Sequence, residues 1–102
     1  MKDEQGFLTM LGFAAKARKL VSGESAVESF LSKKNQVVLL ILAQDLAQGR
    51  KMFWEKKARE FKVDVIEGTD KITLGTAIGM SPRGVIAMTD QQMMQALLAK
   101  YR

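Results

Sequence analysis

Apolar residues recur at helical spacing in several parts of the chain. In residues 7–15 they fall on one face at about 3.6 residues per turn, which is typical of an amphipathic helix. The same period predicts three more helices, over residues 26–31, 50–62 and 94–101. A shorter helix is predicted over residues 69–79.

Continuous apolar runs mark the strands. Residues 37–42 are apolar without alternation, which favours a strand buried on both faces of a parallel or mixed sheet. Residues 63–67 and 84–89 predict two further strands, and Leu20 with Val21 predicts a very short one. Because strands alternate with helices, we expect an α/β layered domain, in which ligands usually meet loops at strand ends. The candidate loops are Ser22–Ser25, Ala43–Ala47 and Met80–Gly84.

Polar residues predict where the helices begin and end. We expect Ser22 or Ser25 to cap the second helix, because a serine oxygen accepts hydrogen bonds from the free amides of a first turn. Ser25 and Glu28 also have the spacing of a capping box. The other predicted helix-start residues are Thr69 or Asp70 and Asp90, and Gly79 is a predicted stop.

The composition narrows the classes of function. A chain of 102 residues suits one domain, spanning residues 1–102. Lys and Arg number 16 against 11 Asp and Glu, and the net charge of +5 favours a polyanionic partner. Cys and His are both absent, which excludes disulfides, thiolate nucleophiles and imidazole catalysis. We expect no metal site and no cofactor.

The sequence also contains features that indicate the cellular compartment of the protein. The longest apolar run, residues 37–43, is far shorter than the roughly 20 residues of a membrane-spanning helix. The first residues do not follow the charged-then-apolar pattern of a signal peptide. Together with the missing cysteines, these features predict a cytoplasmic protein.

Catalysis has little support in the sequence. No nucleophile–base pair can be named, and the carboxylates lack the apolar surroundings that shift a pKa usefully. Asp45, at the end of a buried strand, is the best catalytic candidate, but a cap on the following helix is the favoured interpretation. We therefore expect a non-enzymatic protein without catalytic residues.

The turn Ser22–Ser25 has the features of an anion site as well as those of a cap. A helix N-terminus offers free amides and a partial positive charge, and Gly23 allows close approach of a backbone. Glu24 could accept hydrogen bonds from base amino or imino groups. Phosphate charges would be met by the upstream residues Lys16, Arg18 and Lys19. A plain helix cap and an RNA-facing edge are compatible roles for this turn.

Three blocks, "LGFAAKARKLVSGESAV", "VVLLILAQDLAQG" and "LGTAIGMSPRGVIAMTD", occur in this order. In this combination the chain resembles the bacterial YlxQ-like branch of the ribosomal protein superfamily that includes archaeal L7Ae and eukaryotic L30e. The resemblance extends from Leu8 to Ala99. It implies a three-layer α/β/α sandwich, with a mixed sheet of about four strands and five helices.

The same resemblance implies RNA binding, with the kink-turn as the family's best-known target. A kink-turn is a sharply bent internal loop that carries tandem sheared G·A pairs. Family members insert the start of the second helix into the groove at those pairs, and an apolar loop before the last main strand covers flipped-out bases. This mode agrees with the general rule that proteins read RNA at bulges and splayed bases. Structured or ribosomal RNA, the ribosome, and proteins of translation or RNA processing are the implied partners.

The family's reader motif is only partly kept. The resemblance places Gly-Thr-Asn-Glu on Ser22–Ser25, with Glu28 where the family has a lysine. Glu24 then replaces an asparagine by an acceptor-only carboxylate, and Arg83 is a gain in the loop before the last strand. The implied RNA-binding residues are Lys16, Arg18, Lys19, Ser22, Gly23, Glu24, Ser25, Gln44, Asp45, Ser81 and Arg83.

A protein-interaction module on the same fold is the alternative function. The acidic replacements at Glu24 and Glu28 favour it, and the helix that carries Trp54 could offer a docking face. A docking face on this helix requires Trp54 to be exposed.

Overall fold

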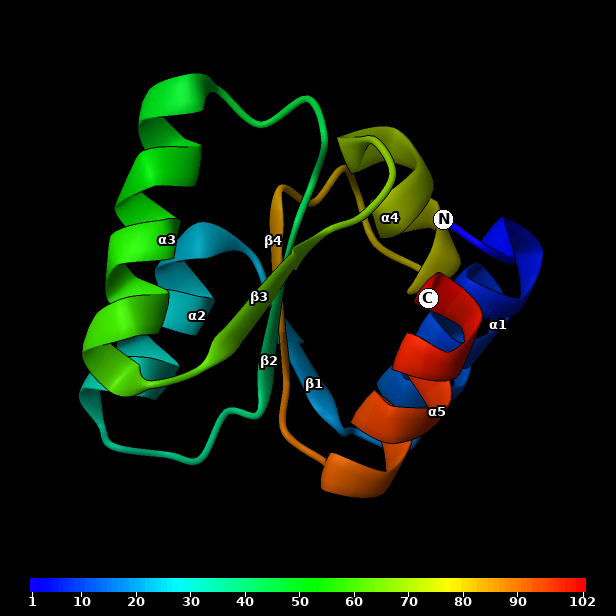
Figure 1. Cartoon of the computed structure of the whole chain (residues 1–102), viewed down its shortest axis with the longest axis horizontal. Coiled ribbons are helices and arrows are strands. Elements are labelled where there is room, and N and C mark those ends of the chain that lie inside the picture. The colour runs from blue at the N-terminus through cyan, green and yellow to red at the C-terminus, as the bar shows by residue number, and fades with distance from the viewer.

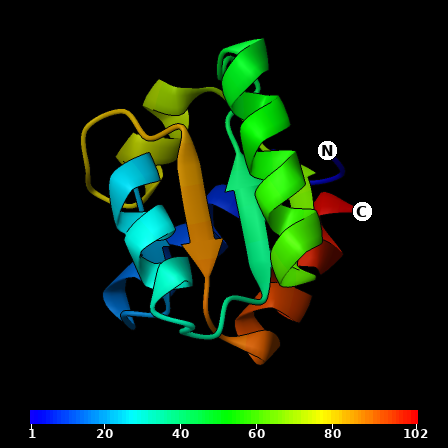
Figure 2. The same ribbon diagram turned by 90° about the vertical axis from the view of Figure 1, so that its left-hand side faces the viewer.

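The computed structural model describes residues 1–102 as helices packed on both faces of one sheet (Figure 1). The elements are α1 (Glu4–Lys16), β1 (Leu20–Ser22), α2 (Glu24–Ser32), β2 (Leu39–Leu42), α3 (Gln48–Phe61), β3 (Asp64–Glu67), α4 (Lys71–Ala77), β4 (Val85–Met88) and α5 (Gln91–Tyr101). Helices α2 and α3 cover one face of the sheet, and α1, α4 and α5 cover the other (Figure 2). The predicted α/β/α sandwich of four strands and five helices is confirmed.

The sheet is mixed, with the strand order β1-β4-β2-β3. β2 pairs with β3 in parallel and with β4 antiparallel, and β1 pairs only with β4. Every residue of β2 and β4 is buried, whereas the edge strands β1 and β3 are partly exposed. Central strands covered on both faces need an apolar side chain at each position, which explains the unbroken apolar runs.

Because of the strand directions, four loops lie together at one end of the strands, at the top of Figure 1. The C-terminal ends of β1, β2 and β3 lie there together with the start of β4. We call this the loop edge and define it as residues 22–25, 43–47, 68–71 and 80–84. All three candidate loops of the sequence therefore meet in space.

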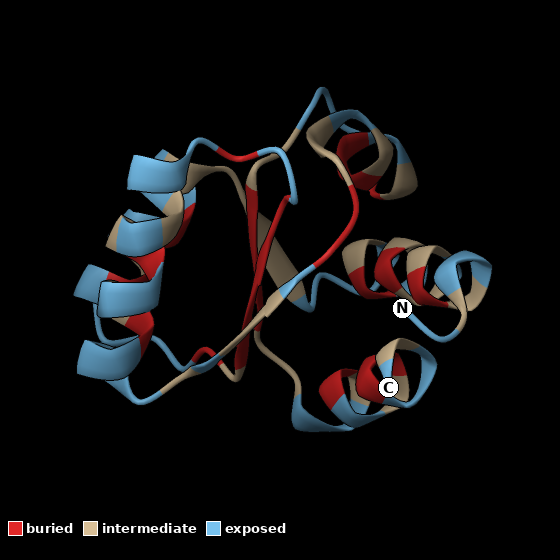
Figure 3. Cartoon of the chain, turned by 45° about the horizontal axis from the view of Figure 1, so that its top comes forward, coloured by how far each residue is buried: buried red, intermediate tan, exposed pale blue.

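The core lies between the sheet and the two helical layers. Phe7, Leu11, Trp54 and Leu97 are completely buried, and each such side chain contributes about 1.5–3 kcal/mol to folding. In Figure 3 the buried residues of each helix form a stripe that faces the sheet, as the helical period predicts. None of the helices combines the length and the apolar character that a membrane crossing needs.

Aspartates cap three of the five helices. Carboxylate oxygens of Asp3, Asp70 and Asp90 accept hydrogen bonds from amides of the first turns of α1, α4 and α5. For Asp70, hydrogen bonds from the backbone and hydroxyl of Thr73 hold the pKa below its ordinary value. The predicted caps Asp70 and Asp90 are confirmed.

The predicted cap of α2 is wrong. The N-cap residue is Gly23, no side chain caps the helix, and Ser25 already lies within its first turn. Gly23 has φ 95°, a conformation that residues with a Cβ rarely adopt, and its amide donates to the carbonyl of Val85. The chain therefore turns on glycine, and Ser25 and Glu28 form no capping box.

Candidate nucleic-acid interface

Arg83 is the centre of the loop edge. Its Nε donates to Ser22 Oγ at 3.0 Å, and its Nη1 donates to Ser81 Oγ at 2.7 Å. Carbonyl oxygens of Ser81 and Pro82 also accept from Nη1, at 3.2 and 3.4 Å. These contacts join β1 to the loop before β4, so Ser22, Ser81 and Arg83 form one cluster.

The charge of Arg83 is not neutralised within the protein. No carboxylate lies within ion-pair distance of its guanidinium, and Nη2 has no acceptor in the chain. A guanidinium held by hydroxyl and carbonyl oxygens keeps its full positive charge, and its free N–H groups suit phosphate oxygens or the face of a base. The cluster therefore holds a cation in place while leaving its Nη2 donors available to an acceptor outside the protein.

Glu24, the first residue of α2, faces α3. Its Oε1 accepts from Trp54 Nε1 at 2.7 Å and from Arg50 Nε at 2.8 Å, and Arg50 Nη2 also lies 2.8 Å away. Burial alone would raise the pKa of Glu24, but the hydrogen bonds from Trp54 and Arg50 and the nearby cations outweigh it and lower that pKa. Glu24 is thus a fixed anion, and its Oε2 has no partner within the protein.

Trp54 is completely buried, and its indole N–H reaches Glu24. A buried indole needs an acceptor for its single donor, and the start of α2 supplies one. The predicted docking face that required an exposed Trp54 is therefore wrong.

Gln44 and Asp45 connect neighbouring loops. The backbone carbonyl of Gln44 accepts a hydrogen bond from Lys51 Nζ at 2.7 Å, and the backbone amide of Gln44 donates to the backbone carbonyl of Thr69. Asp45 Oδ1 accepts from the amide of Lys71, the first residue of α4, at 3.0 Å. Asp45 therefore serves α4 rather than the next helix, because α3 begins after Ala47 without a side-chain cap. The cap predicted for Asp45 is assigned to the wrong helix.

The three upstream cations do not act as one group. Lys19 lies at the opposite end of β1, where its Nζ is 4.0 Å from Asp90 Oδ1 at the start of α5. Lys16 and Arg18 line a cavity on the flank of β1 that Ser22 also lines. Ser25 is exposed on the first turn of α2. Lys16 and Arg18 thus share a cavity with Ser22, whereas Lys19 does not line it.

The sequence analysis missed two further cations, Lys71 at the loop edge and Arg50 beside it in α3. Arg50 is bound by Glu24 and lies over the ring of Phe53, with its Cζ 4.2 Å from the ring centroid. The backbone oxygen of Lys71 accepts a hydrogen bond from the backbone amide of Arg83. The positive charge of the Lys71 side chain contributes to the lowered pKa of Glu24. Each follows a candidate loop or a predicted cap, which is the only signal in the sequence that could have identified them.

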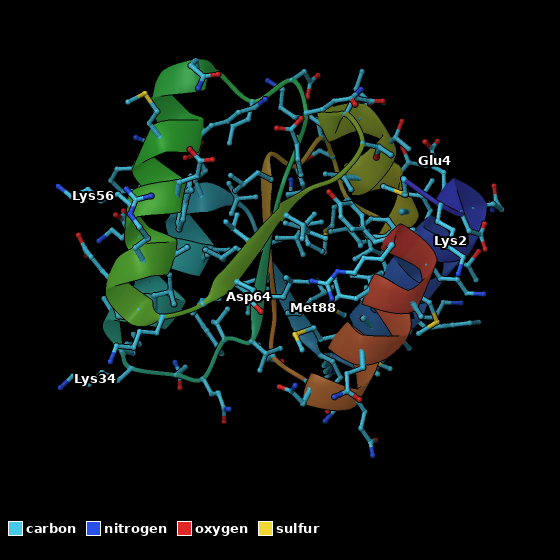
Figure 4. The ribbon with its side chains drawn as sticks, viewed as in Figure 1. Lys2, Glu4, Lys34, Lys56, Asp64 and Met88 are labelled. Carbon is cyan, nitrogen blue, oxygen red and sulfur yellow. The ribbon has the colours of Figure 1, made fainter.

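Other basic residues lie away from this site. Lys34 and Lys56 extend from the side of the molecule formed by α2 and α3 and point into solvent (Figure 4). Both are exposed, and neither forms an ion pair in the protein. They provide cations against which the loop edge can be compared.

Comparison with known proteins identifies the relationship. The model of the ribosomal protein L7Ae/L30e/S12e/Gadd45 family matches residues 7–98. The RNA-binding protein YlxQ of Bacillus subtilis (strain 168) is 31% identical over 90 residues, which cover 88% of this chain and 89% of that protein. A solved structure from Bacillus halodurans C, of a protein with unknown function, is 33% identical, with a TM-score of 0.83 over 91% of this chain and 93% of the other.

A more distant structure shares the fold. The 15.5kD RNA binding protein of Giardia lamblia has a TM-score of 0.74 and 16% identity, over 93% of this chain and 81% of that one. These findings confirm the resemblance carried by the three sequence blocks. The chain belongs to the ribosomal protein L7Ae/L30e/S12e/Gadd45 family.

Proposed function

We propose that this protein is a non-catalytic RNA-binding protein whose loop edge holds a structured RNA, with a kink-turn as its preferred form. The observation that carries the proposal is the uncompensated guanidinium of Arg83, fixed by Ser22 and Ser81 beside the start of α2. The relative named as an RNA-binding protein, at 31% identity over most of both chains, supports the same function.

In this proposal, the residues of the loop edge make different kinds of contact with the RNA. Arg83 contacts a phosphate or stacks on a base, and the uncapped amides at the start of α2 add donors for phosphate oxygens. The free Oε2 of Glu24 accepts from a base imino or amino group, while its Oε1 keeps Arg50 in place. Ser25, Gln44 and Asp45 supply polar contacts at the rim.

The target belongs to the class of structured RNAs, and ribosomal RNA is the member that the family name favours. Proteins of translation or RNA processing would then be neighbours in the assembled particle. The carboxylates of the loop edge act as hydrogen-bond acceptors in this proposal, so no catalytic step is assigned to them.

The test is a titration of the purified protein against a kink-turn RNA and against the same RNA with its G·A pairs replaced, at several salt concentrations. We expect tighter binding to the intact kink-turn. Equal and strongly salt-dependent binding would indicate a shape-tolerant RNA binder with another target. Absence of binding at low salt would contradict the proposal and favour a protein-interaction module.

Two single substitutions test whether the loop edge is the surface that binds RNA. We expect Arg83→Gln to weaken binding by roughly tenfold or more, because a charged hydrogen bond to RNA is lost. Lys56→Gln is the matched control, since it removes one exposed positive charge from α3, outside the loop edge. Equal losses in the two variants would mean that the overall charge, rather than the loop edge, binds the RNA.

A further inference from the structure

A cavity of about 530 Å³ lies on the flank of β1, between the end of α1 and the end of α4. Leu20, Ile78 and Met80 contribute its apolar wall, and Gly12, Ala15 and Ala77 leave it hollow because their side chains are small or absent. Its volume is in the range of pockets that hold small organic ligands. The function proposed above does not use this space.

Two cations border the cavity. Lys16 ends α1 and Arg18 follows in the turn toward β1, and neither forms an ion pair within the protein. An apolar wall beside unpaired cations fits a flat, weakly polar ring that carries an anionic group. Met80, a residue that is 54% exposed, adds a polarisable thioether, which packs well on aromatic rings. A nucleotide has this combination of ring and phosphate.

The cavity is continuous with the loop edge. Ser22 and Met80 belong to both, and Ser22 Oγ is also the acceptor for Arg83 Nε. An RNA strand that runs from Arg83 along β1 therefore meets the cavity wall at Ser22 and Met80. Lys19 is outside this path, because it pairs with Asp90 at the opposite edge of the sheet.

We propose that this cavity is a second RNA subsite, which takes one unstacked nucleotide of the RNA held at the loop edge. The base lies against Leu20, Ile78 and Met80, and the phosphate meets Lys16 and Arg18. This inference rests on the proposed RNA-binding function and extends it to a surface formed by α1, β1 and α4. Stacking of a splayed base on a protein platform is a general way to hold single-stranded segments.

The methyl group of Ile78 reports occupancy of the cavity, and that of Met80 reports the border between the cavity and the loop edge. The protein is labelled at the Ile and Met methyl groups and titrated, in separate arms, with kink-turn RNA and with uridine 5′-monophosphate. We expect both ligands to shift the Ile78 and Met80 signals, the mononucleotide more weakly. Met52 is the matched control, because it is exposed on α3 to a similar degree, at 61% against 54% for Met80.

A pair of variants tests the phosphate contact. Arg18→Asn removes one charge from a residue at φ 58°, a left-handed conformation that asparagine tolerates. Lys34→Asn makes the same change at φ 59°, far from the cavity. We expect Arg18→Asn to weaken RNA binding by about tenfold, to reduce the salt slope by about one and to remove the Ile78 shift, and Lys34→Asn to do none of these.

The outcomes separate this subsite from the proposed function. If RNA binds through Arg83 while Ile78 and Met80 respond no more than Met52, the subsite is wrong and the proposed function stands. If only the mononucleotide shifts these signals, the cavity binds free nucleotide and its assignment to the RNA strand is wrong. If no RNA binds at low salt, both proposals fail.

Discussion

At the scale of single residues, Glu24 links the buried core to the loop edge. Its carboxylate satisfies the buried indole of Trp54 and fixes Arg50, and both contacts use Oε1. Folding therefore stabilises the ionised form, and the pKa of Glu24 lies below its ordinary value of 4.5. A group with a lowered folded pKa contributes stability above its unfolded pKa and loses it as the pH falls through the folded value.

We expect Glu24→Gln to be less stable than the wild type at neutral pH and to lose less of its stability on acidification. The amide keeps an acceptor for Trp54 but has no charge for Arg50. Urea unfolding from neutral pH to about pH 3 measures this difference. Glu55→Gln, at an exposed position of α3, is the control, and an acid slope reduced equally in both variants would contradict the assignment to Glu24.

From the sequence one can predict which polar residues lie in the loops of the loop edge, but not which of them contact each other. The serine before Gly23 has the appearance of a helix cap, yet its oxygen is taken by Arg83, which lies 61 positions away in the sequence. Arg50 and Lys71 look like ordinary surface cations because nothing local indicates that they converge on Glu24. Contacts between distant loops depend on strand order, and no short motif encodes that order.

At the scale of elements, three helices end on a basic residue in a left-handed conformation. Arg18, Lys34 and Lys62 have φ between 56° and 59° and follow α1, α2 and α3. Glycine is the usual residue there, because a side chain makes this conformation costly. Cations at these ends interact favourably with the helix dipole, which partly offsets the cost.

We expect Lys62→Gly to raise the free energy of unfolding by about 1 kcal/mol, because glycine relieves the left-handed strain. Lys56→Gly, in the interior of α3, should lower it by about 1 kcal/mol through the poor helix propensity of glycine. Urea unfolding of the two variants measures both effects. Destabilisation by Lys62→Gly would show that the lysine side chain contributes more than its backbone costs.

Elements differ in how well the sequence predicts them. β2 and β4 are buried throughout, so an unbroken apolar run identifies them. β1 has only three half-buried residues and gives a weak pattern. The parallel pairing of β2 with β3 and the central place of β4 depend on contacts between elements, which local periodicity does not contain.

At the scale of the whole molecule, both ends of the strands carry charges of both signs. The loop edge holds Lys71 and Arg83 together with three carboxylates, Glu24, Asp45 and Asp70. At the opposite end of the strands, Lys19 is close to Asp90. The net charge of +5 therefore matters less at the loop edge than the placement of Arg83, which has no carboxylate partner.

The sequence predicts that Lys19→Ala weakens binding to every RNA, whereas its position in the fold leads us to expect little change. Lys19 lies outside the loop edge, does not line the cavity beside Lys16 and Arg18, and has its Nζ 4.0 Å from Asp90 Oδ1, which offsets its charge. RNA affinity at physiological and at low salt measures this effect. A loss as large as that of Arg83→Gln would place the RNA across both edges of the sheet.

The contact between Trp54 and Glu24 gives the protein an internal optical probe. Trp54 is the only tryptophan, and its indole is sealed in the core beside an ionised carboxylate at the start of α2. Indole emission responds to solvent and to nearby charge, so its wavelength follows unfolding, and its intensity follows any rearrangement of Glu24 and Arg50. We therefore expect a ligand that contacts Glu24 at the loop edge to change the Trp54 emission of the unlabelled chain.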